Sequence, residues 1–184
     1  MALIFKARVM DQPAFERTLV RIAHQIIEKN SGAENLCLVG INTRGRHLAR
    51  RLAANIQTIE GSLPPVGWMH IAHDPGHTMS CQVTQVQIPF PLEGKTVILV
   101  DEVIFTCRTA RAAMDALFAH GQPTRVQLFC MIDRGHAQLP IKATFVGKNL
   151  PTSLREMVRV ELEEVDQQTG VSIYQIAEPD GAQQ

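Results

Sequence analysis

One apolar run limits the fold of this chain more than any other feature. Val97 to Val100 form a continuous apolar segment, which is typical of a strand buried on both faces of a parallel sheet. Two acids, Asp101 and Glu102, follow this strand, and Thr106-Cys107-Arg108-Thr109 then leads into a helix expected from about Thr109 to Ala119. A strand, a polar turn and a helix in this order are typical of an α/β domain.

Apolar patterns on both sides of this segment continue the alternation. A helix is expected between Asp11 and the turn Asn30–Gly32, and a second one between the loop Ile41–Gly45 and Gly61. Residues 73–82 show no regular pattern. The predicted strands are Leu36–Gly40, Val66–Ala72, Val83–Ile88, Thr96–Val100, Val126–Ile132, Met157–Leu162 and Val171–Ile176. Together they predict an α/β fold with a mostly parallel central sheet flanked by helices.

The composition indicates one ordinary globular domain. The 184 residues are 45% hydrophobic and 20% charged, so we expect a single domain over 1–177 and a flexible tail over 178–184. A net charge of zero excludes generic binding of polyanions, and any nucleic-acid site has to be a local patch. Four cysteines without a CxxC pair suit a reducing compartment. Since no apolar stretch reaches the ~18 residues of a membrane span, and the N-terminus lacks a signal-peptide layout, we expect a cytoplasmic protein.

Three loops are expected at the carboxyl ends of the strands, where α/β sheets bind ligands. They are residues 41–45, 101–109 and 133–136. In the middle loop, Asp101 and Glu102 can accept hydrogen bonds from the vicinal hydroxyls of a ribose. Backbone N–H groups at a helix start, two threonine hydroxyls and the Arg108 guanidinium make an anion cradle. These residues predict a ribose 5-phosphate site; the alternative is an acidic loop followed by an ordinary threonine cap.

The segment from Val97 to Thr109 resembles the diphosphosugar-binding motif of type I phosphoribosyltransferases. Five further blocks, in the correct order, resemble the bifunctional members that combine regulation of pyrimidine operons by transcription attenuation with uracil phosphoribosyltransferase activity. These blocks are Arg21–His24, Val39–Gly45, Asp133–His136, Gly147–Ser153 and Leu162–Asp166. The resemblance covers nearly the whole chain. It implies the type I phosphoribosyltransferase fold, with a small hood subdomain beside the central sheet.

The resemblance also implies ligands, partners and site residues. Family members bind pyrimidine operon leader mRNA in response to UMP or UTP. They make UMP and diphosphate from uracil and phosphoribosyl diphosphate with Mg²⁺ and no organic cofactor, and they form homodimers or homotetramers. Carried over by position, Asp101, Glu102 and Arg44 are the expected catalytic residues. The expected phosphoribosyl contacts are Thr43, Arg44, Gly45, Asp101, Glu102, Thr106, Cys107, Arg108 and Thr109.

Departures from the family pattern gather at this centre. Glu102 stands where the family has a second aspartate, and Cys107 stands where it has a glycine that admits a phosphate to the backbone. The segment 69–82 replaces a mobile lid, and it lies in a stretch without any lysine or arginine between Arg51 and Lys95. Since a lid without a cation cannot balance the charge of a departing diphosphate, we expect weak or absent transferase activity with nucleotide binding retained.

A local basic surface is the expected RNA site. The family's RNA-binding positions correspond to Arg21, His24, Lys29, His136, Lys142, Lys148 and Thr152. Most of the basic positions are kept, but Val20 replaces a threonine and Ala137 an arginine, which we expect to reduce affinity. On the residues alone, the cations Arg21 and His24 also fit an ordinary solvated helix face.

Three alternatives remain open. His70, His73, His77 and Cys81, with Asp74 among them, have spacings that would place them on one helix face for zinc, although Pro75-Gly76 breaks such a helix. A polar loop in place of the lid is the simpler interpretation of this segment, and we assign no firm metal site. The chain could also be a salvage uracil phosphoribosyltransferase without an RNA role, or a nucleotide-sensing pseudoenzyme.

Overall fold

The computed structural model of this chain describes residues 2–73 and 81–177, which form two sheets and four helices. In chain order the elements are β1 (Leu3–Met10), α1 (Gln12–Asn30), β2 (Leu36–Ile41), α2 (Asn42–Glu60), β3 (Val66–His73), β4 (Cys81–Gln87), β5 (Thr96–Ile104), α3 (Arg108–His120), β6 (Arg125–Asp133), β7 (Phe145–Asn149), β8 (Glu156–Glu161), α4 (Glu163–Asp166) and β9 (Gly170–Ile176).

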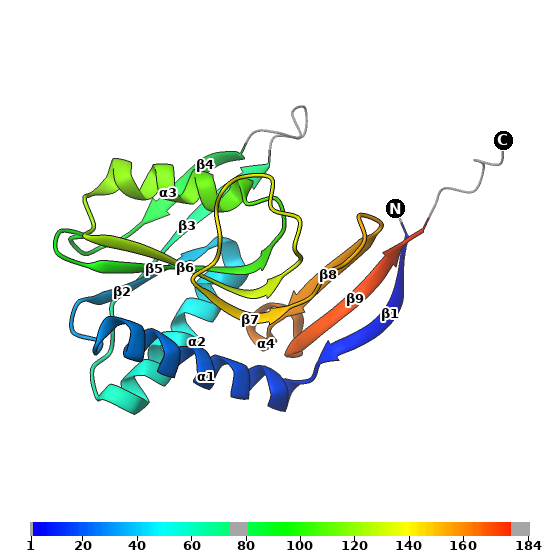
Figure 1. Ribbon diagram of the computed structural model, residues 1–184, viewed down its shortest axis with the longest axis horizontal. Helices are drawn as coiled ribbons and strands as arrows, with labels where there is room; N and C mark the ends of the chain where they lie inside the picture. The colour runs from blue at the N-terminus through cyan, green and yellow to red at the C-terminus, as the bar shows by residue number, and fades with distance from the viewer. Residues whose placement is uncertain (1, 74–80, 178–184) are drawn as a thin grey trace.

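The larger sheet has the strand order β4-β3-β2-β5-β6-β7, in which β4 alone runs antiparallel to its neighbour. Helices α1 and α2 cover one face of this sheet, and α3 covers the other (Figure 1). The predicted mostly parallel sheet flanked by helices is therefore confirmed. Because β2, β5 and β6 are parallel neighbours, their carboxyl ends lie together at one edge of the sheet.

The strand β5 is buried on both faces, as its unbroken apolar run predicts. Ile98 and Val100 belong to the core under α1 and α2, whereas Val97 and Leu99 belong to the core under α3. All four side chains are fully buried. The alternation of side chains along a strand thus joins two hydrophobic cores through one segment of the sequence.

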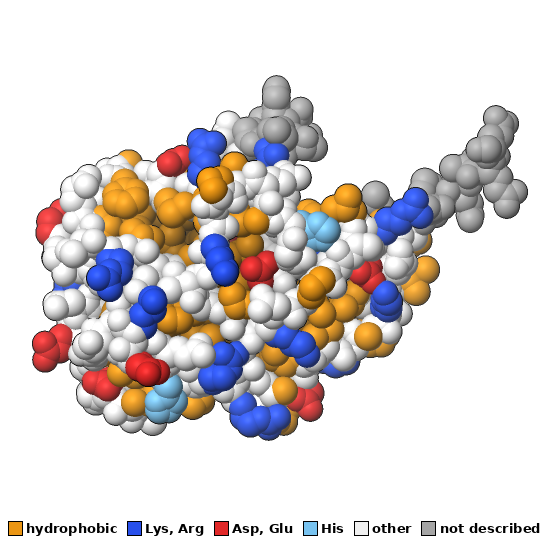
Figure 2. All heavy atoms as spheres, in the orientation of Figure 1, with side chains coloured by type: hydrophobic (Ala, Val, Ile, Leu, Met, Phe, Trp, Pro, Cys, Tyr) orange, Lys and Arg blue, Asp and Glu red, His pale blue; other side chains and the backbone are white. Residues whose placement is uncertain are grey.

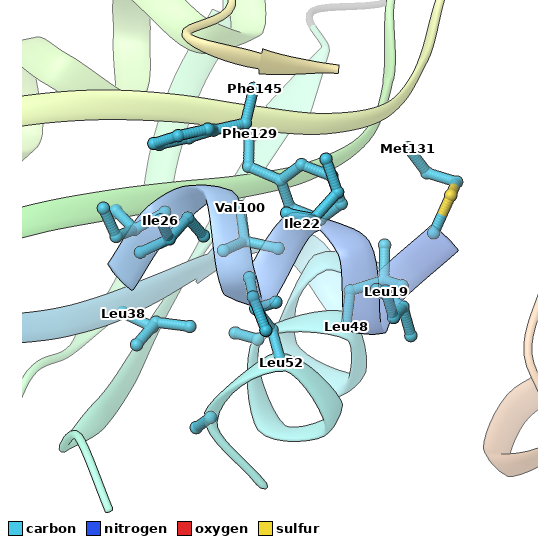
Figure 3. Packing of buried hydrophobic residues seen from close by; sticks show 14 of the residues in the cluster. Leu19, Ile22, Ile26, Leu38, Leu48, Leu52, Val100, Phe129, Met131 and Phe145 are labelled. Carbon is cyan, nitrogen blue, oxygen red and sulfur yellow. The ribbon is translucent and has the colours of Figure 1, made fainter. Parts of the chain in front are cut away.

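Helix α1 follows from its own sequence. The Asp11 side chain caps it by accepting a hydrogen bond of 2.9 Å from the backbone N–H of Ala14, and Pro13 lies in the first turn. Its apolar residues Leu19, Ile22 and Ile26 point toward α2 and the sheet, where Leu48, Leu52, Val100 and Phe129 receive them (Figure 3). The predicted start and end of this helix are confirmed.

A second, three-stranded antiparallel sheet with the order β1-β9-β8 forms the expected hood. It lies beyond the carboxyl ends of the central strands (Figure 1). Two ion pairs, Arg44–Asp166 and Arg51–Glu164, join α2 to the short helix α4 of the hood. The sequence did not predict β1, which is charged and largely exposed, or the short, glycine-containing β7.

Three boundary predictions were wrong. Residues 42–45 are not a loop, because α2 begins at Asn42. Strand β5 does not end before the acid pair but continues through Asp101 and Glu102 to Ile104, since it still pairs with β6 there. The stretch 73–82 is not irregular at its two ends, which belong to the paired strands β3 and β4. The rest of the lid, 74–80, and the predicted tail, 178–184, lie outside the described residues.

No helix among the described residues is long and apolar enough to cross a membrane.

We attribute the stability of the fold to the hydrophobic core, and a substitution at one position of α2 tests this.

We expect Leu52→Ala to lower the free energy of unfolding by ~3 kcal/mol, because it removes a fully buried side chain and leaves a cavity between α2 and the sheet. Urea titration followed by circular dichroism measures this change. The matched control is Leu154→Ala, at a side chain that is 72% exposed, which we expect to change stability by no more than about 0.5 kcal/mol. Equal effects at the two positions would contradict this account of the core.

Candidate active site

The acid pair lies near the carboxyl end of β5. Asp101 is only 6% exposed, and its Oδ1 accepts a hydrogen bond of 2.9 Å from the backbone N–H of Glu102. Burial, together with the neighbouring Glu102 carboxylate, raises the pKa of Asp101 well above its ordinary value. Glu102 is half-buried, and its Oε2 has no hydrogen-bond partner among the described residues. The pair therefore contains an acceptor oxygen that no described group satisfies.

Residues 105–107, called the phosphate loop for their expected role, connect β5 to α3. Helix α3 starts at Arg108, and no side chain of the described residues caps its N-terminus. The first N–H groups of a helix have no partner within the helix and carry the positive end of its dipole. A hollow of about 180 Å³ lies beside this helix start, and its walls include Asp101, Thr106 and Thr109. An open helix start beside a carboxylate is a suitable place for a phosphate joined to a diol.

Cys107 adopts the conformation that a glycine would take. Its φ is 67°, in the left-handed region, which costs an L-residue about 1–2 kcal/mol. The side chain is buried, and its Sγ donates a hydrogen bond of 3.4 Å to the carbonyl oxygen of Ile141. The backbone of Cys107 is thus strained, while the thiol itself is held by the segment after β6.

The expected diphosphate-facing residues occupy the first turn of α2. A Cβ on Gly45 would lie 2.5 Å from the carbonyl oxygen of Val100, so only glycine lets this turn approach β5 so closely. Arg44 donates from Nε and Nη2 to the Asp166 carboxylate at 3.1 and 2.6 Å. Its pKa is raised mainly by this hydrogen bond, with Glu102 adding a smaller Coulombic effect. Arg44 is therefore near the acid pair, but the hood holds its guanidinium.

Two further residues shape this edge and received no role from the sequence. Asp166 is the partner of Arg44, and its Oδ2 also accepts a hydrogen bond of 3.0 Å from the Leu162 backbone. Asn42 has a φ of 59°, and its Oδ1 accepts a hydrogen bond of 2.8 Å from the Ile71 N–H, which joins α2 to β3. The sequence offered two signals for these residues. Asp166 ends one of the blocks that resemble the family, and Asn42 lies between a predicted strand and a predicted helix.

The expected RNA residues lie on neighbouring elements. Helix α1 packs beside β7, and Arg21 of α1 donates a hydrogen bond of 2.6 Å to the carbonyl oxygen of Gly147, next to the exposed Lys148. His136 Nε2 lies 2.5 Å from the carbonyl oxygen of Thr152. His24, Lys29 and Lys142 are also exposed. On the face shown in Figure 2, basic side chains alternate with acidic and apolar ones and do not form one continuous patch.

The helical arrangement considered for zinc is not formed in the described residues. His70 lies on β3 and Cys81 on β4, two antiparallel strands, and His70 Nδ1 lies 3.1 Å from Thr84 Oγ1. The described residues contain no group of three or more metal-binding side chains. His77 and Asp74 lie outside the described residues, so the complete set of five remains a prediction.

Comparison with known proteins identifies the family. Residues 7–165 match the family model of the phosphoribosyl transferase domain. A bifunctional protein PyrR from Pelotomaculum thermopropionicum is 50% identical over 177 residues, which cover 94% of this chain and 98% of that protein. One from Thermus aquaticus is 49% identical and covers 93% and 97%. This chain belongs to the PyrR group of phosphoribosyltransferases.

Solved structures agree with the fold that PyrR membership implies. A hypoxanthine phosphoribosyltransferase from Trypanosoma cruzi, in complex with IMP, superposes with a TM-score of 0.75 at 13% identity, covering 92% of this chain and 94% of that one. A hypoxanthine-guanine phosphoribosyltransferase from Bacillus anthracis gives 0.72 at 16% identity, covering 94% and 99%. The expected type I phosphoribosyltransferase fold is confirmed.

In this PyrR-group chain we expect Asp101→Asn to raise the free energy of unfolding at pH 8 by about 1 kcal/mol. Replacing a residue that lowers stability at a functional site commonly gives a gain of this size. The folded-state pKa of Asp101 is raised, so the native state binds more protons than the unfolded state. Stability is then lost as the pH rises above the ordinary carboxyl range. Urea titrations of both proteins between pH 4 and pH 8 measure this slope. A variant that is no more stable than wild type at pH 8 would contradict a raised pKa of Asp101.

Proposed function

We propose that this protein is a pyrimidine-nucleotide-responsive regulator that binds the leader mRNA of pyrimidine biosynthesis genes, with a slow uracil phosphoribosyltransferase activity. PyrR membership at about 50% identity over nearly the whole chain is the observation that carries this proposal. The site supports it, because the buried Asp101, the half-buried Glu102 and an uncapped helix start lie together at the edge of the sheet.

In the proposed binding mode, UMP or UTP occupies the loop between β5 and α3. The Asp101 and Glu102 carboxylates accept hydrogen bonds from the two ribose hydroxyls. The N–H groups at the start of α3, with the hydroxyls of Thr106 and Thr109, donate to the 5-phosphate. Phosphoribosyl diphosphate uses the same contacts and places its diphosphate toward the first turn of α2.

The same residues fit Mg²⁺. Hard oxygen ligands suit this ion, and both Asp101 and the unpartnered Oε2 of Glu102 supply them. When bound with phosphoribosyl diphosphate, Mg²⁺ supplies charge neutralisation for the diphosphate. Charge from the ion also favours the ionised form of Asp101, whose pKa the protein alone holds high. No organic cofactor is needed for this chemistry.

Transfer to uracil needs more than binding, and here the chain is poorly equipped. No lysine or arginine lies between Arg51 and Lys95, so the lid segment brings no cation to the leaving diphosphate. The guanidinium of Arg44, in the first turn of α2, forms a bidentate ion pair with Asp166. These features weaken stabilisation of the transition state while leaving the contacts to ribose and 5-phosphate in place.

The proposed RNA surface is formed by α1, β7 and the loops that follow β6 and β7. Cations such as Arg21 and Lys148 contact phosphates, while sequence is read from unpaired bases of a hairpin loop. We place this function in the cytoplasm, where cysteine thiols stay reduced. A homodimer or homotetramer would present this surface more than once to the same transcript.

We expect a turnover number for UMP formation at least tenfold below the ~10 s⁻¹ of a typical enzyme. Restoring the family residues in the double variant Glu102→Asp, Cys107→Gly should raise kcat/KM about tenfold, because the acid is repositioned and the left-handed residue relaxes. Separation of UMP from radiolabelled uracil measures both rates, and calorimetry with UMP checks binding. Wild-type turnover at the typical rate, without leader binding, would select the salvage enzyme instead. Nucleotide binding with neither activity would select the pseudoenzyme.

We expect Lys148→Ala to weaken binding of a fluorescent pyrimidine leader hairpin and to reduce the slope of log K against log salt by about one, because one phosphate contact is lost. The matched control is Arg111→Ala on the exposed side of α3, away from α1 and β7, which should leave both values unchanged. Fluorescence anisotropy at three salt concentrations gives these values. Equal losses in the two variants would contradict a local RNA surface.

A further inference from the structure

The guanidinium of Arg134 is buried next to the phosphate loop. It follows β6 directly and is 8% exposed. Its Nε donates a hydrogen bond of 2.7 Å to the Thr152 hydroxyl, and its Nη2 donates to the carbonyl oxygens of Ser153 and Glu156 at 3.0 and 2.7 Å. A buried cation needs such partners, and a planar fork that uses them fixes the segment from Thr152 to Glu156 in one position.

The same guanidinium also packs on the phosphate loop. Its central carbon lies 4.1 Å from the centroid of the Phe105 ring, which is a cation–π contact. Phe105 directly precedes Thr106, the first residue of the proposed phosphate cradle. The backbone N–H of Arg134 donates to the Ile104 carbonyl oxygen at 3.0 Å, so both the backbone and the side chain of this residue hold the loop.

A second contact leads from Phe105 to the proposed RNA surface. The ring of His136 meets the ring of Phe105 edge to face, with centroids 5.1 Å apart and planes at 69°. His136 also bonds to the carbonyl oxygen of Thr152, whose hydroxyl is the partner of Arg134. Two residues of the proposed RNA surface, His136 and Thr152, are therefore joined to the phosphate loop through Phe105 and Arg134.

We propose that Arg134 and Phe105 are positioning residues that couple nucleotide binding in the phosphate loop to the shape of the RNA surface. A phosphate that binds the amides after Phe105 fixes the position of its ring under Arg134. That position in turn fixes His136 and Thr152. Since a ligand shifts an equilibrium only by its differential affinity for two states, the coupling requires that these contacts differ between the states with and without nucleotide.

This inference rests on the proposed function, and linkage makes it measurable. If UMP tightens RNA binding by a given factor, RNA must tighten UMP binding by the same factor. The coupling is therefore the ratio of the RNA Kd without UMP to the RNA Kd at saturating UMP, and the reciprocal UMP titration checks it. A ratio removes changes that affect both affinities equally, such as partial unfolding.

The test measures this ratio with a fluorescent pyrimidine leader hairpin at one salt concentration. We expect the wild-type ratio to fall within the roughly 5- to 150-fold range of known couplings, and Phe105→Leu and Arg134→Lys to bring it below about twofold. Leucine removes the ring face but keeps an apolar side chain, and lysine keeps the charge but loses the planar fork. Phe105→Tyr should retain the wild-type ratio, because it keeps the ring.

Arg125→Lys, at the exposed opposite end of β6, is the matched control and should also keep the wild-type ratio. Wild-type ratios in both Phe105→Leu and Arg134→Lys would overturn the inference and leave the proposed function intact. Loss of UMP binding in both variants would overturn it as well, because these residues would then belong to the nucleotide site itself. A wild-type ratio of one, or no RNA binding, would contradict the proposed function.

Discussion

The parallel pairing of β5 with β2 on one side and β6 on the other is the constraint on which the rest of the molecule depends. It buries the run from Val97 to Val100 in two cores and brings three carboxyl ends to one edge. Gly45 then lets the first turn of α2 lie directly against β5. The acid pair, the start of α3 and the start of α2 meet at this edge. Because β5 is buried on both faces, the polar residues that follow its apolar run lie at its carboxyl end.

The electrostatics of this edge follow from the same burial. Asp101 is removed from water beside a second carboxylate, which makes its charged form costly until a cation or a donor arrives. The start of α3 supplies positive potential nearby without a side-chain cap. The hood adds the Asp166 carboxylate, which binds Arg44 and joins the small sheet to the large one. The carboxyl groups of the acid pair and the positive potential at the start of α3 are thus charges that a ligand can neutralise.

The sequence predicted those features that depend on local pattern. The apolar run of β5, the start and end of α1 and the order of the family blocks were all readable. The start of α2 was not, because Asn42 adopts a positive φ that tertiary contact with β3 sustains. The pairing of Arg44 with Asp166 was also missed, since it joins residues 122 positions apart. The roles assigned to individual site residues remain predictions.

Loss of catalytic power and retention of regulation are compatible in such a site for a physical reason. A lid cation acts on charge that develops on the departing diphosphate, so its absence raises the barrier without weakening ground-state binding. UMP has no diphosphate to lose, and in the proposed binding mode its ribose and phosphate meet only the acid pair and the start of α3. Signalling to RNA then requires a connection from that loop, and the contacts of Phe105 with Arg134 and His136 offer one. A chain can therefore lose the transfer reaction and keep every contact that regulation uses.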